Sequence, residues 1–152
     1  MTQIRSSVTC ANEPRGTSLN GSGGRIAAGT PLAAALNDHR YALLTTFRRT
    51  GLPITTPVWF AVVGGRVYFR TPESTGKAKR LRRNSRVRIA PCTVRGRATG
   101  PDIDATARRL GPEETEAVRR ALEQRYGIQI RVVDLLLRFR REHPIFFEVA
   151  PP

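Results

Sequence analysis

The chain has little cysteine and no long hydrophobic run, and each absence narrows what it can be. Its two cysteines, Cys10 and Cys92, lie far apart in the sequence, which argues against a disulfide framework and against a zinc site. No apolar stretch is long enough to cross a membrane, and no apolar core follows a basic start as it would in a secretory signal. We therefore expect a cytoplasmic protein without a bound metal.

Acidic residues are also scarce, with 12 against 26 basic residues and a net charge of +14. The excess is concentrated, because residues 66–97 contain eleven basic residues and a single acidic one, Glu73. Such a field indicates an anionic partner, although solvated arginines would account for part of it. A small anionic cofactor and a nucleic acid both remain open. The nucleic acid is the second choice, because no zinc finger, recognition helix or aromatic stacking pair accompanies the arginines.

Composition divides the chain at residue 30. Residues 1–29 are rich in Ser, Gly, Thr and Asn and carry only scattered aliphatic residues at no fixed period, which predicts a disordered leader. The glycines at positions 21, 23 and 24 do not form a dinucleotide-binding loop, since no strand precedes them. Residues 30–152 are numerous enough to fold as one domain with its own core.

The apolar pattern of residues 30–152 predicts an α+β domain whose first strands form a meander. Strands are expected at 41–47, 54–63, 67–71, 86–92, 96–110 and 144–149, and helices at 31–38, 77–84, 112–126 and 130–139. The fifth strand should bend at Gly100-Pro101, and the last helix should bury Val133, Leu136 and Leu137. Six strands of this length favour closure into a small barrel.

The second strand contains a proline. Pro57 cannot donate a hydrogen bond to a sheet, so it should lie at a bulge or an edge, where the backbone can open toward a ligand. Trp59 follows two residues later on the same face of the strand. A strand tryptophan is more often part of a core than the wall of a cofactor site, and both interpretations stay open here.

The segment after the third strand carries the main candidate site. Residues 72–76 (PESTG) form a cap and turn ahead of a short basic helix, and the only two lysines of the chain lie at its start. Unpaired backbone N–H groups at a helix start, together with a nearby ammonium, favour a bound phosphate. We predict a phosphate site made of Thr71, Ser74, Thr75, Gly76, Lys77 and Lys79. The alternative is an ordinary capped helix with a solvated basic face.

No proton donor can be assigned from the sequence. His39 and His143 are isolated histidines at the ends of predicted elements, and neither is a strong catalytic candidate. Asp102 and Asp104 lie two residues apart on one strand face, where a solvated edge accounts for them. The catalytic residues therefore stay unknown.

The stretch from Leu43 to Pro101 resembles the split β-barrel superfamily that includes pyridoxamine 5′-phosphate oxidase. The proline-containing second strand, followed by FRT and GKAKRLRRN, carries the resemblance, which extends over about residues 30–150. Within that superfamily the chain looks most like the actinobacterial coenzyme F420-dependent oxidoreductases. The resemblance implies a six-stranded antiparallel split β-barrel, the FMN-binding split barrel, with peripheral helices. It also implies a homodimer with cofactor pockets at the subunit interface.

The resemblance assigns roles to particular residues. The family's phosphate-binding threonine and lysine fall on Thr71 and Lys77, and Arg70 becomes a candidate for the anionic tail of the cofactor. The strand that lines the cofactor ring falls on Thr55, Thr56, Pro57, Val58, Trp59 and Phe60. Gly76 replaces an arginine of the vitamin B6 oxidases, and their C-terminal substrate motif has no counterpart here, so vitamin B6 oxidation is not expected.

The expected activity is hydride transfer between reduced coenzyme F420 and an unsaturated or quinone-like small molecule. One alternative is an FMN-binding protein of the same fold that acts as a flavin binder or electron carrier. The other is the basic nucleic-acid-binding module.

Overall fold

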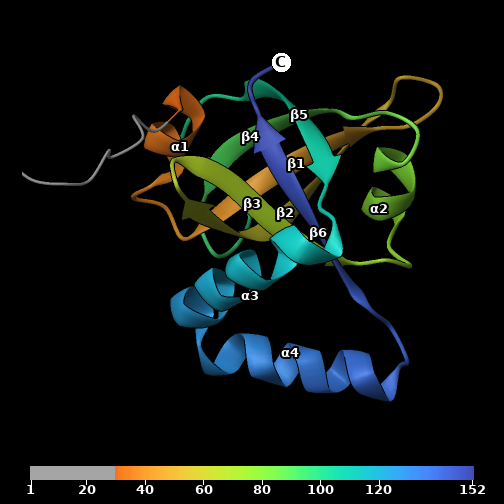
Figure 1. The fold of residues 1–152 in the computed structure, drawn as a ribbon. Coiled ribbons are helices and arrows are strands. Elements are labelled where there is room, and N and C mark those ends of the chain that lie inside the picture. Colours follow the sequence, from red (N-terminus) through yellow and green to blue (C-terminus); the bar gives the residue numbers. More distant parts are fainter. Residues whose placement is uncertain (1–29) are drawn as a thin grey trace, which may run out of the picture.

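The structure is a computed structural model that describes residues 30–152, so the predicted disordered leader lies outside the described residues. Figure 1 shows the order of the elements along the chain. They are α1 (Pro31–Leu36), β1 (Tyr41–Phe47), β2 (Pro53–Val63), β3 (Arg66–Pro72), α2 (Gly76–Leu81), β4 (Arg86–Cys92), β5 (Ile103–Arg109), α3 (Pro112–Tyr126), α4 (Ile128–Phe139) and β6 (Pro144–Ala150).

The strands close into an antiparallel barrel in the order β1-β2-β3-β6-β5-β4. This confirms the predicted fold class, a six-stranded antiparallel barrel with peripheral helices. The bounds of β1 and β4 agree with the sequence prediction at both ends. Alternation explains the agreement, because in β4 Val87 and Ile89 are buried while Arg86 and Arg88 are exposed.

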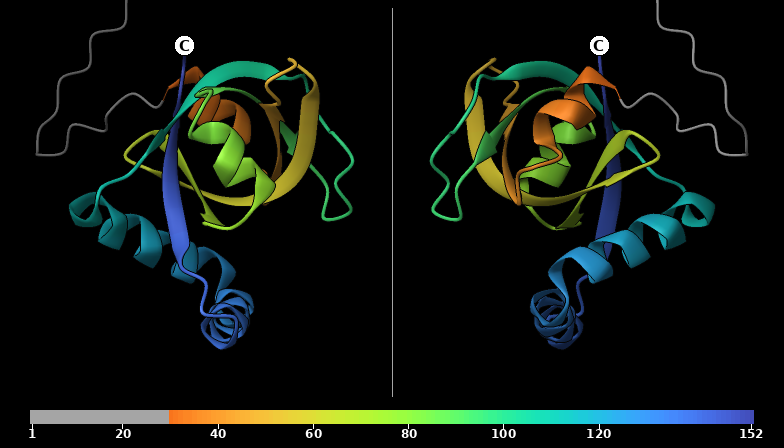
Figure 2. Two further views of the ribbon diagram at one scale, coloured as in Figure 1. Left: turned by 90° about the vertical axis from the view of Figure 1, so that its right-hand side faces the viewer. Right: turned by 90° about the vertical axis from the view of Figure 1, so that its left-hand side faces the viewer.

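Two short helices close the ends of the barrel, as the two end-on views of Figure 2 show. Thr30 caps α1 by accepting a hydrogen bond from the amide of Ala33, and Pro31 occupies the first helical turn. The buried face of α1 and the two buried residues of α2, Ala78 and Leu81, join the same core as the inward side chains of the strands. The position of α2 therefore follows from its apolar pair.

The longer helices lie on the outside of the barrel (Figure 1). Helix α3 packs over β2 through Val118, Leu122 and Tyr126. The Tyr126 hydroxyl fixes the contact, because it accepts a hydrogen bond from the Phe60 amide at 3.0 Å and lies 2.6 Å from the Arg40 carbonyl oxygen. Helix α4 lies farther from the strands and runs along the lower side of the molecule.

Two predictions about these elements are wrong. The fifth strand begins at Ile103, not at residue 96, and residues 93–102 form a loop joined to β4 by one bridge between Cys92 and Ala98. A hydrogen-bonded turn between Thr93 and Gly96, followed by Pro101, interrupts the ladder there. In α4, Leu136 is 57% exposed, and the buried residues are Ile130 and Leu137.

Among the described residues, no helix is long and apolar enough to span a bilayer. The same part of the chain contains no group of three or more His, Cys, Asp or Glu side chains placed to bind a metal ion.

Candidate functional site

The pairing between β2 and β3 stops halfway along the strands and opens a cleft. The two strands pair from Val63–Arg66 to Phe60–Phe69, and beyond Phe60 each strand keeps only its other neighbour. Residues Pro57, Val58 and Trp59 of β2 then face Arg70, Thr71 and Pro72 of β3 across a cavity of about 220 Å³. These are the residues that would have paired had the ladder continued.

Pro57 lies on the open edge of β2. Its pairing with Leu43 of β1 is in register with the pairs on either side, so the strand has no bulge here. The sequence allowed either a bulge or an edge for Pro57, and the structure has the edge. Proline has no backbone N–H, so Pro57 leaves no unpaired donor on the edge that faces the cleft.

Lys77 brings a cation into the cleft from the first turn of α2. Burial lowers the pKa of its ammonium, and the nearby charge of Arg80 lowers it further. The opposite wall is apolar, with Val133 and Leu137 from α4. The cleft therefore holds a partly desolvated cation beside an apolar wall, which is a favourable setting for an anionic group attached to an apolar ring.

The hydroxyl groups next to Lys77 are engaged within the chain. The Thr75 hydroxyl accepts from the Ala78 amide and donates to the Pro72 carbonyl at 2.8 Å. The Thr71 hydroxyl lies 3.0 Å from that of Thr75, whose proton is already committed, so Thr71 is the donor of this hydrogen bond. Thr71 thus braces the cap of α2 and retains only acceptor capacity.

Several predicted site residues lie away from the cleft. Phe60 is fully buried, and its side chain belongs to the barrel core. Thr55 is exposed and exchanges a hydroxyl hydrogen bond with Thr45 at 2.8 Å. Ser74 and Lys79 are exposed and line other hollows. The predicted phosphate site is therefore divided, and of its members only Thr71 and Lys77 line the cleft.

Two of the predicted residues have environments of their own. Arg70 lines the cleft, but its guanidinium is paired with Asp134 of α4 at 2.6 Å and its side chain is 7% exposed. That charge is already compensated, which weakens its predicted role toward a cofactor tail. The Thr56 hydroxyl oxygen is buried without a hydrogen-bond partner among the described residues.

Trp59 both packs against another aromatic ring and lines the cleft, so the two interpretations offered by the sequence, core residue and cofactor-site wall, both apply. Its ring stacks on Tyr126 of α3, with centroids 5.1 Å apart and planes inclined by 15°, and the residue also lines the cleft. Helix α3 thus fixes the orientation of the tryptophan that forms part of the cleft wall. Sequence reasoning missed Tyr126, and it missed every contribution of α4, because these residues lie more than 60 positions from the strands they meet.

Neither histidine lines the cleft, and the two aspartates do not either. Asp104 pairs with Arg88 at 3.2 Å on an exposed face, which agrees with the expected solvated edge. The cleft residues offer the Lys77 ammonium, apolar and aromatic walls and backbone groups, and no histidine or carboxylate. Such a site can hold and orient a reactive group more readily than it can supply acid–base chemistry itself.

Comparisons with known proteins identify the family and the fold. The family model described as pyridoxamine 5′-phosphate oxidase matches residues 30–146. A search of curated proteins found no match. Among solved structures, the conserved hypothetical protein Rv2991 from Mycobacterium tuberculosis is similar over 86% of both chains, with a TM-score of 0.60 and 20% identity.

Two further solved structures share the fold. The heme storage protein HutZ from Vibrio cholerae matches with a TM-score of 0.61 and 17% identity, over 80% of this chain and 87% of that one. An FAD-binding protein from Mesorhizobium loti matches with a TM-score of 0.54 and 15% identity, over 79% and 84% of the two chains.

Proposed function

Since the chain belongs to the pyridoxamine 5′-phosphate oxidase family, we propose that its β2–β3 cleft binds a phosphate-bearing flavin-type cofactor, and that this cofactor is coenzyme F420. The observation that carries the proposal is Lys77, a partly desolvated cation that lines the cleft where the β2–β3 ladder ends. An unliganded protein gains nothing from burying an ammonium without a carboxylate beside it. A bound phosphate would compensate that charge.

The residues present fit such a group. The ring system would lie along the open edge of Pro57, Val58 and Trp59, where an apolar and aromatic surface runs beside unpaired backbone. The phosphate would lie at Lys77, close to the first amides of α2, which have no acceptor inside the helix. Gly76, where the vitamin B6 oxidases have an arginine, argues against a vitamin B6 compound as the substrate of the bound cofactor.

When bound, F420 supplies the hydride chemistry, and the protein supplies position and electrostatics. Trp59, held by its stack on Tyr126, would fix one side of the ring. Lys77 would hold the phosphate end, so that the ring cannot slide along the strand. The substrate is proposed to be an unsaturated or quinone-like small molecule approaching the exposed face of the ring.

FMN is the second candidate, because it offers the same phosphate and a similar ring to the same cleft. The FAD-binding protein from Mesorhizobium loti shares the fold, which is compatible with a flavin here. Heme is less well supported. A heme iron requires an axial ligand, and the described histidines, His39 and His143, do not line the cleft.

We also propose that two copies of the chain associate and complete the cofactor site. The cleft of one chain, about 220 Å³, is smaller than the roughly 300–1,000 Å³ typical of ligand pockets, so another wall is needed. Helix α4 forms one side of the cleft and presents a row of exposed apolar residues on its outer side. They are Ile128, Val132, Leu135, Leu136 and Phe139, each more than half exposed. Such a patch is typical of a protein interface.

The cofactor is tested by titrating the protein with F420 and, separately, with FMN, and following the change in cofactor fluorescence. Lys77→Ala should weaken binding of the preferred cofactor by about tenfold or more, since a charge-assisted hydrogen bond contributes about 1.5–3 kcal/mol. The matched control, Arg95→Ala, removes one charge from an exposed loop and should leave affinity unchanged. Equal affinities for the wild type and Lys77→Ala would remove the proposed site.

The same titration decides between F420 and FMN as the cofactor. Tight binding of F420 with weak binding of FMN supports the reductase, and the loaded protein should then oxidise reduced F420 in the presence of a quinone. Tight binding of FMN alone would favour the flavin binder or electron carrier. Binding of neither, with retention of the fold by circular dichroism, would overturn the proposed function.

A further inference from the structure

A second cavity lies between the β1–β2 turn and α2, and it is strongly basic. Its walls carry five cations, Arg48, Arg49, Lys79, Arg80 and Arg83, and its volume is about 670 Å³. We refer to these five residues and the cavity they surround as the basic basin. None of the residues that line it lines the β2–β3 cleft, so it is a separate site.

The charge of the basic basin is not compensated within the described residues. Other arginines nearby have carboxylate partners, such as Arg82 with Glu73 at 2.8 Å and Arg88 with Asp104 at 3.2 Å. None of the ion pairs in residues 30–152 involves a cation of the basic basin. The walls contain no carboxylate either. Like charges held together without a counter-ion raise the free energy of the unliganded state.

Arg80 is held in place within this cavity. Its Nε donates to the hydroxyl of Thr46 at 2.7 Å, and Thr46 is fully buried in β1. A Cβ added at Gly76 would come within 2.9 Å of the Arg80 Nη1 atom, so the glycine makes room for the guanidinium. With Nε anchored, both Nη groups remain for a ligand. Burial and the charge of Arg48 lower the pKa of Arg80, which agrees with its crowded cationic surroundings.

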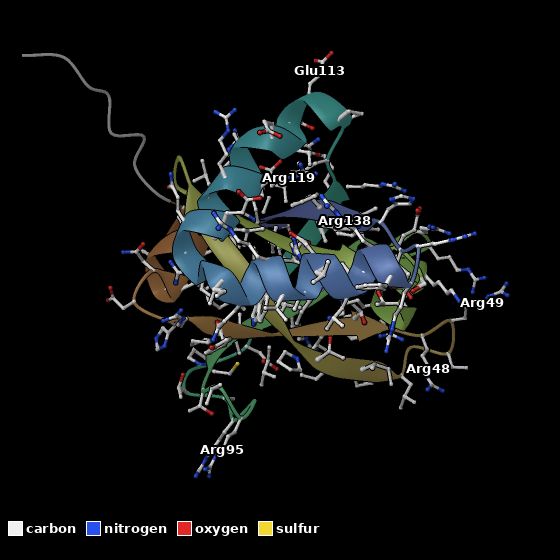
Figure 3. All side chains as sticks on the ribbon, turned by 90° about the horizontal axis from the view of Figure 1, so that it is seen from below. Arg48, Arg49, Arg95, Glu113, Arg119 and Arg138 are labelled. Atoms are coloured by element: carbon white, nitrogen blue, oxygen red, sulfur yellow. The ribbon has the colours of Figure 1, made fainter. Side chains whose placement is uncertain are left out.

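The two arginines on the other side are presented by a tight turn. The Arg48 amide donates to the Leu52 carbonyl, and its own carbonyl accepts from the amide of Gly51, at 2.9 Å in each case. Gly51 has φ of +84°, a conformation that glycine adopts without strain. Figure 3 shows the labelled side chains of Arg48 and Arg49 together at this end of the molecule, away from Arg95 on its separate loop.

We propose that the basic basin binds a compact oligophosphate, either a free polyphosphate or the phosphate chain of a nucleotide. Several guanidinium groups around one cavity suit the closely spaced oxygens of such a chain, because each fork can bind two of them. The cavity has the size of a small-molecule pocket. This proposal does not depend on the function assigned to the cleft.

Phe47, the aromatic residue that lines the basic basin, favours a phosphate chain over a nucleic acid as the ligand. The ring of Phe47 already lies under the guanidinium groups of Arg86 and Arg88, at 6.0 and 5.7 Å from its centroid. The wall therefore offers charge and little free stacking surface, whereas single-strand binding combines a basic groove with aromatic platforms. The basin also gathers its cations in one hollow instead of along a track.

The test is calorimetric titration of the full chain with sodium tripolyphosphate, at low and at physiological ionic strength. The double variant Arg49→Gln/Arg83→Gln should weaken tripolyphosphate binding by about tenfold, an effect of about 1.4 kcal/mol. The matched control, Arg95→Gln/Arg97→Gln, removes two exposed arginines from the 93–102 loop and should leave the dissociation constant within about twofold of the wild type. Equal weakening of both variants would overturn the proposal.

Titrations with other ligands test whether the basic basin recognises the phosphate chain and whether a nucleotide can supply that chain. ATP without metal should bind as well as tripolyphosphate if the phosphate chain is what the basin recognises. Citrate, a carboxylate trianion, should bind at least about tenfold more weakly; comparable binding would overturn the assignment to phosphate. A single-stranded oligonucleotide that binds more tightly than tripolyphosphate, and is weakened equally by both double variants, would also overturn it.

The Lys77→Ala variant tests whether tripolyphosphate binds in the basic basin or in the β2–β3 cleft. The variant should retain the tripolyphosphate affinity of the wild type, and an excess of F420 or FMN should not displace the ligand. Loss of tripolyphosphate binding in Lys77→Ala would show that the anion occupies the cleft, and the proposal would fall. The cofactor titrations described above would be unaffected by that result.

Discussion

Arg70 of β3 and Asp134 of α4 form an ion pair across the side of the cleft, with 2.6 Å between Nη2 and Oδ1. The arginine side chain is 7% exposed and the aspartate 32%. This pair joins α4 to the strand that carries Thr71, in addition to the packing of Ile130 in the cluster that contains Ala61 of β2 and Phe146 of β6. The ion pair, between residues 64 positions apart, thus lies beside the cleft wall formed by Val133 and Leu137.

Removing the carboxylate of this pair should destabilise the protein. Asp134→Ala leaves the buried Arg70 charge without its partner, and we expect the free energy of unfolding to fall by about 1–3 kcal/mol. Urea unfolding followed by circular dichroism measures the change. Asp102→Ala, at an exposed position that forms no ion pair with another residue of 30–152, is the control and should change stability by less than about 0.5 kcal/mol. A change no larger than in this control would show that the pair does not stabilise the fold.

The partly buried ammonium of Lys77 should make stability depend on pH in the alkaline range. Because its pKa in the folded protein lies below the ordinary value of 10.5, the unfolded chain binds more protons between these two values. Stability should therefore rise with pH through this window and level off above 10.5. Lys77→Met lacks this rise and should be more stable than the wild type at neutral pH.

The comparison requires both proteins unfolded in urea at several pH values without a cofactor. The difference between their free energies of unfolding isolates Lys77 from other groups that titrate in the same range. A difference that does not change with pH would contradict the burial of the ammonium.

Tyr126 should contribute to stability through its hydroxyl. Tyr126→Phe keeps the stack on Trp59 but leaves the buried Phe60 amide without its acceptor. We expect a loss of about 1–3 kcal/mol in the free energy of unfolding. Tyr41→Phe is the matched control, because the Tyr41 hydroxyl makes no hydrogen bond to another described residue. Similar losses in the two variants would show that the hydroxyl contact with β2 is not what matters.

The apolar row on α4 should govern association of the chain. Sedimentation should show a dimer for the wild type and a monomer for Leu135→Glu/Phe139→Glu, because each glutamate would be buried in the interface without a partner. The monomer should also bind cofactor more weakly. Val94→Glu, on the exposed 93–102 loop, is the control and should remain a dimer. A monomeric wild type would remove the proposed interface.

Local patterns in the sequence were sufficient for most of the fold. Strands β1 and β4 were placed at both ends because alternating burial repeats every two residues and needs no knowledge of the neighbours. Helix α1 was placed by its Thr30-Pro31 start, and α3 by its glycine stop. The fifth strand was extended too far because residues 93–102 alternate weakly without a partner strand.

The sequence by itself determined the barrel, its helices, the place of Lys77 at a helix start and the restriction of Pro57 to a bulge or an edge, since these depend on periodicity, caps and residue chemistry. Only the tertiary structure decided where the β2–β3 ladder ends, that Phe60 turns inward, that Arg70 is paired with Asp134, and that Lys77 and Lys79 face different cavities. The physical reason is that a cleft is a missing contact between segments. Its existence depends on how far paired strands and a distant helix can approach, which no local pattern encodes.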